Sequence, residues 1–221
     1  MKQSTSLIVI GDVHGDSHRL WRAFEEFRSY RVPIVLVGDY IDRGPHSKEV
    51  LEILHQETER NPDGVIPLRG NHEEALIRFL DGGPLEDFAA YGGLATIHSY
   101  VQTVGDDVPA DFRTTFSGRH RDLIEAMRTS YTSDQVFVSH AGFDTENPNS
   151  LDSGILLNGD SRVFRHNGPW PRETTVIGHY VQNCHNPLIT KNLIALDTGC
   201  GSIPGAPLTA VELPGRRIFQ F

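Results

Sequence analysis

Six side chains that can bind a metal ion recur beside glycines along this sequence, each just after a short apolar run. Aspartate, histidine and asparagine supply carboxylate, imidazole and amide-oxygen donors, which together suit manganese, iron or zinc better than calcium or magnesium. No cysteine occurs among them, which argues against a thiolate zinc site. The six residues are Asp12, His14, Asp39, Asn71, His140 and His179.

Six donors are too many for one open catalytic metal ion and suit two ions that share a bridging carboxylate. Two ions about 3.5–4 Å apart can bind both the attacking and the leaving oxygen of an in-line displacement at phosphorus. The pattern therefore predicts a phosphoesterase with two divalent metal ions per chain. We expect manganese, with iron and zinc as alternatives.

Each position also has an ordinary structural interpretation when it is considered alone. An Asp-x-His after a strand commonly forms a hydrogen-bonded turn, and Asn71 in Gly-Asn-His-Glu can cap a helix. Five glycine-flanked polar clusters, each at the end of a predicted strand, are very improbable as independent turns. We therefore favour metal binding over five unrelated turns.

The elements that must hold these side chains are short apolar runs alternating with amphipathic stretches. Buried strands are predicted at 7–10, 34–38 and 65–70, and the apolar faces at 18–28 and 48–60 predict helices. This alternation indicates an α/β fold with parallel strands. Ligands in such folds bind beyond the carboxyl ends of the strands, which is where the polar clusters occur.

The second half of the chain differs from the first in its pattern. Residues 73–130 have mostly helical patterns, and the remaining strands are predicted at 135–140, 174–178, 187–190, 193–197, 207–213 and 216–221. Gly and Pro separate the last four, which predicts a meander or a set of hairpins. We expect two sheets packed face to face with helices outside, in a single domain spanning residues 1–221.

Composition excludes several classes of partner. The formal net charge of -9 argues against non-specific nucleic-acid binding, which depends on basic surface. No apolar run approaches the roughly 18 residues of a membrane-spanning helix. Cys184 and Cys200 are too few for a disulfide framework. We therefore expect a cytoplasmic protein with no nucleic-acid or membrane partner.

The polar clusters together resemble the motifs of the PPP-type metallophosphoesterases, which include protein serine/threonine phosphatases and symmetrical diadenosine tetraphosphate hydrolases. The matching motifs are GDVHG (11–15), GDYIDRG (38–44), GNHE (70–73), HAG (140–142) and GH (178–179). The stretch 92–100 resembles the helical insert of the small bacterial and phage members, and 196–199 fits the same branch. The resemblance implies a calcineurin-like fold, a β-sandwich flanked by helices.

The resemblance also implies how the donors divide between two ions bridged by Asp39: Asp12, His14 and His179 for one, and Asn71 and His140 for the other. His72 would be the general acid, paired with Asp42, and Arg43 would bind phosphate oxygens. The aromatic loop of the eukaryotic phosphatases is replaced by Thr-Gly-Cys-Gly at 198–201, which leaves the substrate open.

A second phosphate-binding arginine is expected close to residue 165. The family's Trp-Ile-Arg pattern aligns with Val163-Phe164-Arg165 and selects Arg165. If residues 160–166 are extended, side chains three apart point to opposite faces, so that Arg162 cannot face the site as well. The segment 91–93 is either part of a substrate-facing lid or a simple helix break.

The predicted reaction is hydrolysis of a phosphate monoester by direct attack of a metal-bridging hydroxide. The favoured substrate is phosphoserine or phosphothreonine in proteins, and a small phosphate ester is also compatible with the motifs. The alternative is a pyrophosphohydrolase acting on dinucleoside polyphosphates such as diadenosine tetraphosphate. A non-catalytic scaffold ranks last, because every expected ligand, together with His72 and Asp42, is present.

Overall fold

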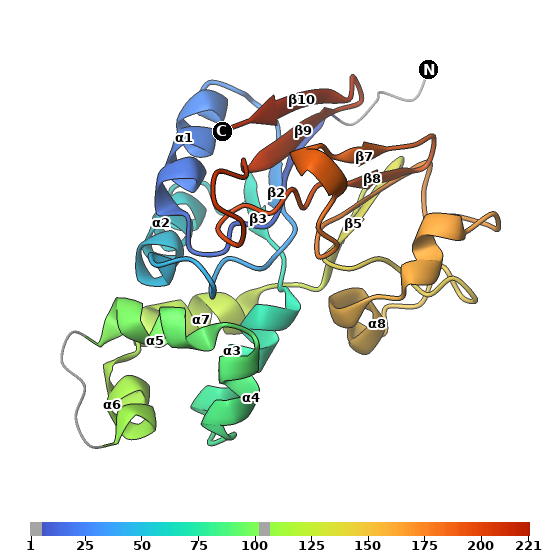
Figure 1. Cartoon of the computed structure of the whole chain (residues 1–221). Coiled ribbons are helices and arrows are strands. Elements are labelled where there is room, and N and C mark those ends of the chain that lie inside the picture. Colours follow the sequence, from blue (N-terminus) through green and yellow to red (C-terminus); the bar gives the residue numbers. More distant parts are fainter. Residues whose placement is uncertain (1–5, 102–106) are drawn as a thin grey trace.

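Two five-stranded sheets form the centre of the protein (Figure 1). The structure is a computed structural model that describes residues 6–101 and 107–221. The first sheet has the order β10-β9-β1-β2-β3. Its strands are β1 (Leu7–Ile10), β2 (Ile34–Leu36), β3 (Val65–Pro67), β9 (Thr209–Leu213) and β10 (Arg217–Gln220).

The second sheet has the order β4-β5-β6-β8-β7. Its strands are β4 (Ser130–Thr132), β5 (Val136–Ser139), β6 (Thr174–Ile177), β7 (Leu188–Ile189) and β8 (Leu193–Ala195). In both sheets three neighbouring strands are parallel and the others antiparallel. The carboxyl ends of β1, β2 and β3, and those of β5 and β6, therefore lie at one edge of each sheet.

Strand β1 shows how one short segment contributes to two cores. Its side chains alternate between the faces of the sheet, and all four are fully buried. Ile8 and Ile10 pack against the helices, while Leu7 and Val9 pack with apolar residues of the second sheet. The predicted sandwich of two mixed sheets with helices outside is therefore confirmed.

Two helices, α1 (Ser17–Phe27) and α2 (Ser47–Arg60), cover the outer face of the first sheet (Figure 1). Helix α1 begins at Asp16, whose carboxylate accepts the backbone N–H of Arg19 at 3.0 Å. Its buried side chains Leu20, Phe24 and Phe27 recur at helical spacing and join the core beneath β1.

The predicted helical patterns between residues 73 and 130 form an insert between β3 and β4. Its helices are α3 (Asn71–Leu80), α4 (Leu85–Ala90), α5 (Gly93–Tyr100), α6 (Val108–Thr115) and α7 (Gly118–Ala126). Figure 1 shows these helices gathered below α1 and α2. Stacked rings of Phe79 and Phe88, with centroids 5.1 Å apart, pack the insert internally.

The last four strands form two hairpins and not one meander, so the hairpin alternative of the sequence-based expectation is confirmed. Strands β7 and β8 pair in the second sheet, whereas β9 and β10 pair in the first. The chain changes sheets because β9 pairs with β1 and places Val211 and Leu213 in the core between the sheets. That pairing is long-range and has no signal in local spacing.

The segment expected to be extended near residue 162 is a 3-10 helix, η1 (Ser161–Arg165). The Asp160 carboxylate accepts the backbone N–H of Arg162 at 2.8 Å and so caps this turn. Two further short elements are α8 (Ser153–Asn158) and η2 (Asn183–His185). Within residues 6–101 and 107–221, no helix has the length and apolar character needed to cross a membrane.

Candidate metal centre

All six predicted donors come together where the two sheets meet at the ends of their parallel strands. Asp12 and His14 follow β1, Asp39 follows β2 and Asn71 follows β3, while His140 and His179 follow β5 and β6. The backbone N–H of His179 donates to Asp12 Oδ2 at 3.0 Å across 167 residues of sequence. The strand-end pattern in the sequence thus corresponds to one place in the fold.

Asp39 is the buried centre of the cluster. Its Oδ2 lies 3.3 Å from His140 Nε2 and 3.7 Å from both His14 Nε2 and His72 Nε2. Its Oδ1 accepts the backbone N–H of His72 at 3.2 Å. A carboxylate with imidazole nitrogens on several sides is the geometry expected of a bridging ligand.

The second group of donors lies around His140. Its Nε2 is 2.9 Å from Asn71 Oδ1 and 3.1 Å from His179 Nδ1, which is itself 3.2 Å from Asn71 Oδ1. The His179 side chain therefore groups with Asn71 and His140, whereas the resemblance had assigned it to Asp12 and His14. The chain thus contains two His/Asp clusters joined by Asp39, one with His14 and His72 and one with His140 and His179.

The donor set fits two divalent metal ions. Asp12 Oδ1 is buried and has no hydrogen-bond partner in the described part of the chain, an arrangement that a bound cation would satisfy. His14 Nδ1 donates to the carbonyl of Ile41 at 2.9 Å and His140 Nδ1 to that of Val37 at 3.2 Å. These bonds leave each Nε2 turned toward Asp39, as in metal-binding histidines whose other nitrogen is fixed.

The charge states of His14 and His179 suit metal binding, whereas Asp39 outweighs burial and raises the pKa of His140 to about 9. Burial lowers the pKa of His14 to about 3, and burial together with His140 lowers that of His179 to about 4, so both present a neutral lone pair near pH 7. Burial opposes ionisation of Asp39, but the surrounding histidines hold its pKa well below the usual range. Burial and the nearby Asp197 carboxylate raise the pKa of Asp12, a repulsion that a cation would relieve.

The backbone is strained at this site. Of the eight non-glycine residues with positive φ in the described ranges, five are predicted site residues: His14, Asp39, Asp42, Arg43 and His179. Such conformations cost of order 1–3 kcal/mol each and persist only where the surrounding structure enforces them. The strain concentrates where side chains must converge from different strands.

Two motif glycines are required by close approach to the ligands. A Cβ at Gly178 would lie 2.0 Å from Asp12 Oδ1, and a Cβ at Gly70 would lie 2.1 Å from Asp39 Oδ1. Both distances are far below van der Waals contact, so any larger residue would displace a carboxylate of the predicted metal site. This explains physically why glycine precedes Asn71 and His179 in the motifs.

His72 and Asp42, which the sequence predicts to act as an acid pair, are in contact, and Thr96 adds a support that the sequence did not reveal. His72 Nδ1 donates to Asp42 Oδ2 at 2.8 Å, and Thr96 Oγ1 donates to Asp42 Oδ1 at 2.6 Å. Thr96 and Ser47 hydroxyls also accept the backbone N–H of Asp42 at 2.9 and 3.1 Å. Burial lowers the pKa of His72, but Asp39 and Asp42 outweigh it and raise that pKa overall.

Glu73 is a second residue whose role sequence reasoning missed. Its buried carboxylate accepts the backbone N–H groups of Asp39, Tyr40 and Gly70 at 2.8–2.9 Å. Burial and the Asp39 carboxylate raise its pKa to about 7. Gly70-x-x-Glu73 has the spacing of a helix capping box, which was the available signal. Glu73 therefore fixes the turn that carries Asp39.

Arg43 reaches the site as predicted. One guanidinium nitrogen lies 2.9 Å from His14 Nε2 and the other lies 3.1 Å from His72 Nε2. The Arg43 side chain also donates to the Ser202 hydroxyl at 3.1 Å. The planar fork is thus held over the cluster, in a geometry that can bind phosphate oxygens in pairs.

The structure does not place Arg165 against the cluster. Arg165 is exposed, and in the described part of the chain it makes no hydrogen bond or ion pair. Arg162 forms surface ion pairs with Asp160 and with Glu146, the latter at 2.9 Å. Helix η1 is tied to the site through Phe164, whose ring centroid lies 5.0 Å from that of Tyr180, the neighbour of His179. The role of Arg165 in binding phosphate stays a prediction.

The segment 91–93, expected to be either a substrate-facing lid or a helix break, carries Tyr91. The following Gly92 adopts a left-handed conformation and caps α5, so the segment is a helix break. The Tyr91 ring also packs edge-on against His72, with centroids 5.2 Å apart. The break therefore brings an aromatic side chain against the predicted acid.

Comparison with known proteins agrees with this geometry. The sequence pattern of the calcineurin-like phosphoesterases matches residues 5–191. Bis(5'-nucleosyl)-tetraphosphatase PrpE (asymmetrical) of Halalkalibacterium halodurans is 26% identical over 93% of this chain and 89% of its own length. Serine/threonine-protein phosphatase PP2A-like PPG1 of Candida albicans is 33% identical over 46% of this chain, which spans about a quarter (24%) of that relative.

Solved structures support the same fold at low sequence identity. A candidate diadenosine tetraphosphatase superposes with a TM-score of 0.62 at 20% identity, over 100% of this chain and 94% of that one. A cold-active protein-tyrosine phosphatase of Shewanella sp. gives a TM-score of 0.63 at 18% identity, over 98% and 77%. With its buried histidine–aspartate metal site, the chain belongs to the calcineurin-like phosphoesterase family and is a metal-dependent phosphoesterase.

Proposed function

We propose that this enzyme hydrolyses dinucleoside polyphosphates, with diadenosine tetraphosphate as the representative substrate. The supporting observation is coverage: similarity to the nucleosyl tetraphosphatase extends over 93% of this chain, whereas similarity to the PP2A-like phosphatase extends over 46%. The preferred order of substrates is therefore the reverse of that expected from the motifs, which favoured phosphoserine or phosphothreonine.

The metal ions would be held by the strand-end donors: Asp12, His14 and Asp39 for one, and Asp39, Asn71, His140 and His179 for the other. When bound, two divalent ions, which we propose to be manganese, supply a water activated as a nucleophile near neutral pH and neutralise charge on the phosphoryl oxygens. The protein's own contribution is to position these groups and the substrate.

Arg43 and His72 are the groups that we assign to the substrate. The Arg43 fork would bind oxygens of the phosphoryl group under attack, because it lies between His14 and His72, both of which face Asp39. His72 would donate a proton from Nε2 to the leaving oxygen, while Asp42 holds Nδ1 and favours the protonated ring. Because both groups lie on one side of the cluster, the leaving group is expected to depart past His72.

Hydrolysis of phosphoproteins is a second candidate, favoured by the acid pair itself. A serine or threonine alkoxide is a poor leaving group and needs a proton, whereas a nucleotide phosphate leaves readily without one. The buried His72–Asp42 pair, supported by Thr96, is a feature that alkyl phosphate chemistry requires more than anhydride chemistry does.

The test compares kcat/KM of the manganese-loaded protein for diadenosine tetraphosphate, a phosphoserine peptide and p-nitrophenyl phosphate. We expect diadenosine tetraphosphate to exceed the peptide by about tenfold or more, as a difference in transition-state binding. Chromatography of the products distinguishes AMP plus ATP from two ADP. An Asp12→Asn preparation controls for contaminating phosphatases. Rapid hydrolysis of the peptide with negligible turnover of the dinucleotide would overturn the proposal.

A further inference from the structure

A cavity of about 340 Å³ lies beside the metal centre, between helices α3 and α4 of the insert. Asn71 lines this cavity and also contacts His140 and His179 in the metal cluster. Tyr91 lines it too and packs against His72. The cavity therefore begins on the side of the site where the leaving group is expected to depart.

The walls of the cavity combine apolar side chains with polar ones such as Arg78 and Asn158, a mixture that suits a base joined to a sugar. The stacked rings of Phe79 and Phe88 form part of its lining, together with the small side chains of Ala75 and Ala90. Tyr91 is half-buried at the junction with the metal centre. Pockets of this size with apolar walls and a few polar groups are typical small-molecule sites.

The two carboxylates that line the cavity differ in whether they already have an ion-pair partner. Glu74 is already engaged by Arg69 at 3.2 Å and by Arg78 at 3.4 Å. Asp87 lines the same cavity, and within the described ranges it accepts no hydrogen bond and forms no ion pair. A carboxylate in this position can accept hydrogen bonds from sugar hydroxyls or from an exocyclic amine.

We propose that this cavity binds the nucleoside of the leaving nucleotide, with the base against its apolar walls. The inference rests on the proposed function, since it assigns a place to one half of a dinucleoside polyphosphate. In the substrate, the leaving oxygen that would lie beside His72 is joined through phosphate to a sugar and a base. Tyr91 contacts His72 and also lines the cavity, so the cavity is the adjoining space for that sugar and base. Base and sugar recognition would thus come from the insert, and hydrolysis from the strand ends.

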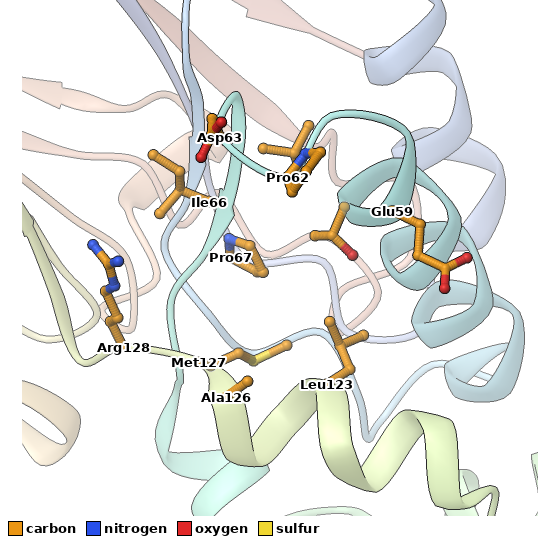
Figure 2. A pocket seen from close by; sticks show the side chains of 11 residues that line it. Glu59, Pro62, Asp63, Ile66, Pro67, Leu123, Ala126, Met127 and Arg128 are labelled. Atoms are coloured by element: carbon orange, nitrogen blue, oxygen red, sulfur yellow. The ribbon is translucent and has the colours of Figure 1, made fainter.

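The chain offers a matched pair of variants for the test. Ala90 is the exposed last residue of α4 and lines the cavity, so Ala90→Trp would fill it. Ala126 is the exposed last residue of α7 and lines a separate hollow of about 570 Å³ beside β3 (Figure 2). Ala126→Trp therefore places the same indole at the same kind of helix end, away from the metal centre.

We expect Ala90→Trp to lower the ratio of kcat/KM for diadenosine tetraphosphate to that for p-nitrophenyl phosphate by about tenfold or more, chiefly through KM. Ala126→Trp should leave this ratio unchanged. Adenosine should inhibit p-nitrophenyl phosphate hydrolysis competitively in the wild type and in Ala126→Trp but not in Ala90→Trp. An equal ratio in both variants, with equal inhibition, would overturn the assignment.

Two further measurements separate the remaining outcomes. If the wild type fails to hydrolyse the dinucleotide, the proposed function fails, and inhibition by adenosine, which carries no phosphate, still decides the cavity assignment. If Ala90→Trp impairs only a phosphoserine peptide, the cavity binds peptide and the nucleoside assignment is wrong. Asp87→Asn serves as the second variant if Ala90→Trp fails to fold, because Asp87 is exposed. We expect it to weaken inhibition by adenosine.

Discussion

Replacement of Thr96 by valine tests whether the insert controls the acid as well as the cavity. Valine matches threonine in shape but lacks the hydroxyl that donates to Asp42 Oδ1 at 2.6 Å. The Asp42 backbone N–H keeps a partner in Ser47 Oγ at 3.1 Å, whereas Oδ1 has no other protein partner among the described residues. The substitution therefore removes the hydrogen bond to a fully buried carboxylate, and with it the contacts of Thr96 Oγ1 with the Asp42 backbone N–H and with Ser47 Oγ.

The bond to the carboxylate sets most of the magnitude, because the Asp42 backbone N–H keeps Ser47 as a partner. A hydrogen bond to a charged group contributes about 1.5–3 kcal/mol, and burial leaves Asp42 no water to replace it. For a chain of 221 residues, a loss of about 2 kcal/mol lowers Tm by roughly 4–8 °C. Thr96→Ser retains the hydroxyl and should lose much less.

The effect on catalysis should appear in the pH profile. Asp39 and Asp42 keep the pKa of His72 raised despite its burial, so the imidazolium persists to higher pH. Without Thr96, burial raises the already elevated pKa of Asp42 further, and its hold on His72 weakens. The alkaline limb of kcat/KM for a phosphoserine peptide should move to lower pH, with kcat down about tenfold, a part of the full general-acid effect.

The assay compares wild type, Thr96→Val and Thr96→Ser by thermal unfolding and by pH–rate profiles with alkyl and aryl phosphates. A Thr96→Val protein with lowered Tm but an unshifted pH profile would show that Thr96 serves stability alone. Equal impairment in Thr96→Ser would show that packing at this position, and not the hydroxyl, is what matters.

The other predictions concern the metal ions, the acid and the arginines. Reconstituted protein should hold two divalent ions per chain by elemental analysis, and chelation should lower Tm because the ions bind only the folded chain; full activity with one ion would exclude a two-metal reaction. His72→Asn should keep its metal content but lose about 10²-fold in kcat, less for p-nitrophenyl phosphate than for alkyl phosphates; equal losses would argue against the acid role. Arg165→Ala should lower kcat/KM by about 10²-fold, whereas Arg162→Ala, which breaks only surface ion pairs, should be nearly neutral; the reverse order would assign the phosphate to Arg162.

The convergence of the strand-end side chains could be predicted from the sequence, because each is marked by local chemistry. A buried apolar run followed by glycine and a polar residue is a short-range pattern, and parallel strands bring such ends together without further information. Strand order alone therefore brings Asp12, Asp39 and His140 to one place, and their roles as metal ligands stay predictions. The same logic predicted the sandwich and its outer helices.

What the sequence did not reveal depends on contacts between distant segments. Thr96 contacts Asp42 across 54 residues, and nothing in its spacing distinguishes it from an ordinary helix residue. The pairing of β9 with β1 decides which sheet receives the last hairpin, and only the assembled core selects it. The alternation rule failed at η1 because the capping carboxylate of Asp160 favours a tight turn over an extended chain.

The left-handed residues at the site have a consequence for how the protein would evolve in the laboratory. Asp39, Asp42 and Arg43 have φ values of 55°, 69° and 65°, where glycine would be free of strain. Selection for heat resistance alone should therefore accumulate glycine and asparagine at these positions and abolish turnover. In a library selected only for thermal stability, the positions replaced in the stable but inactive variants would thus identify the residues that catalysis requires.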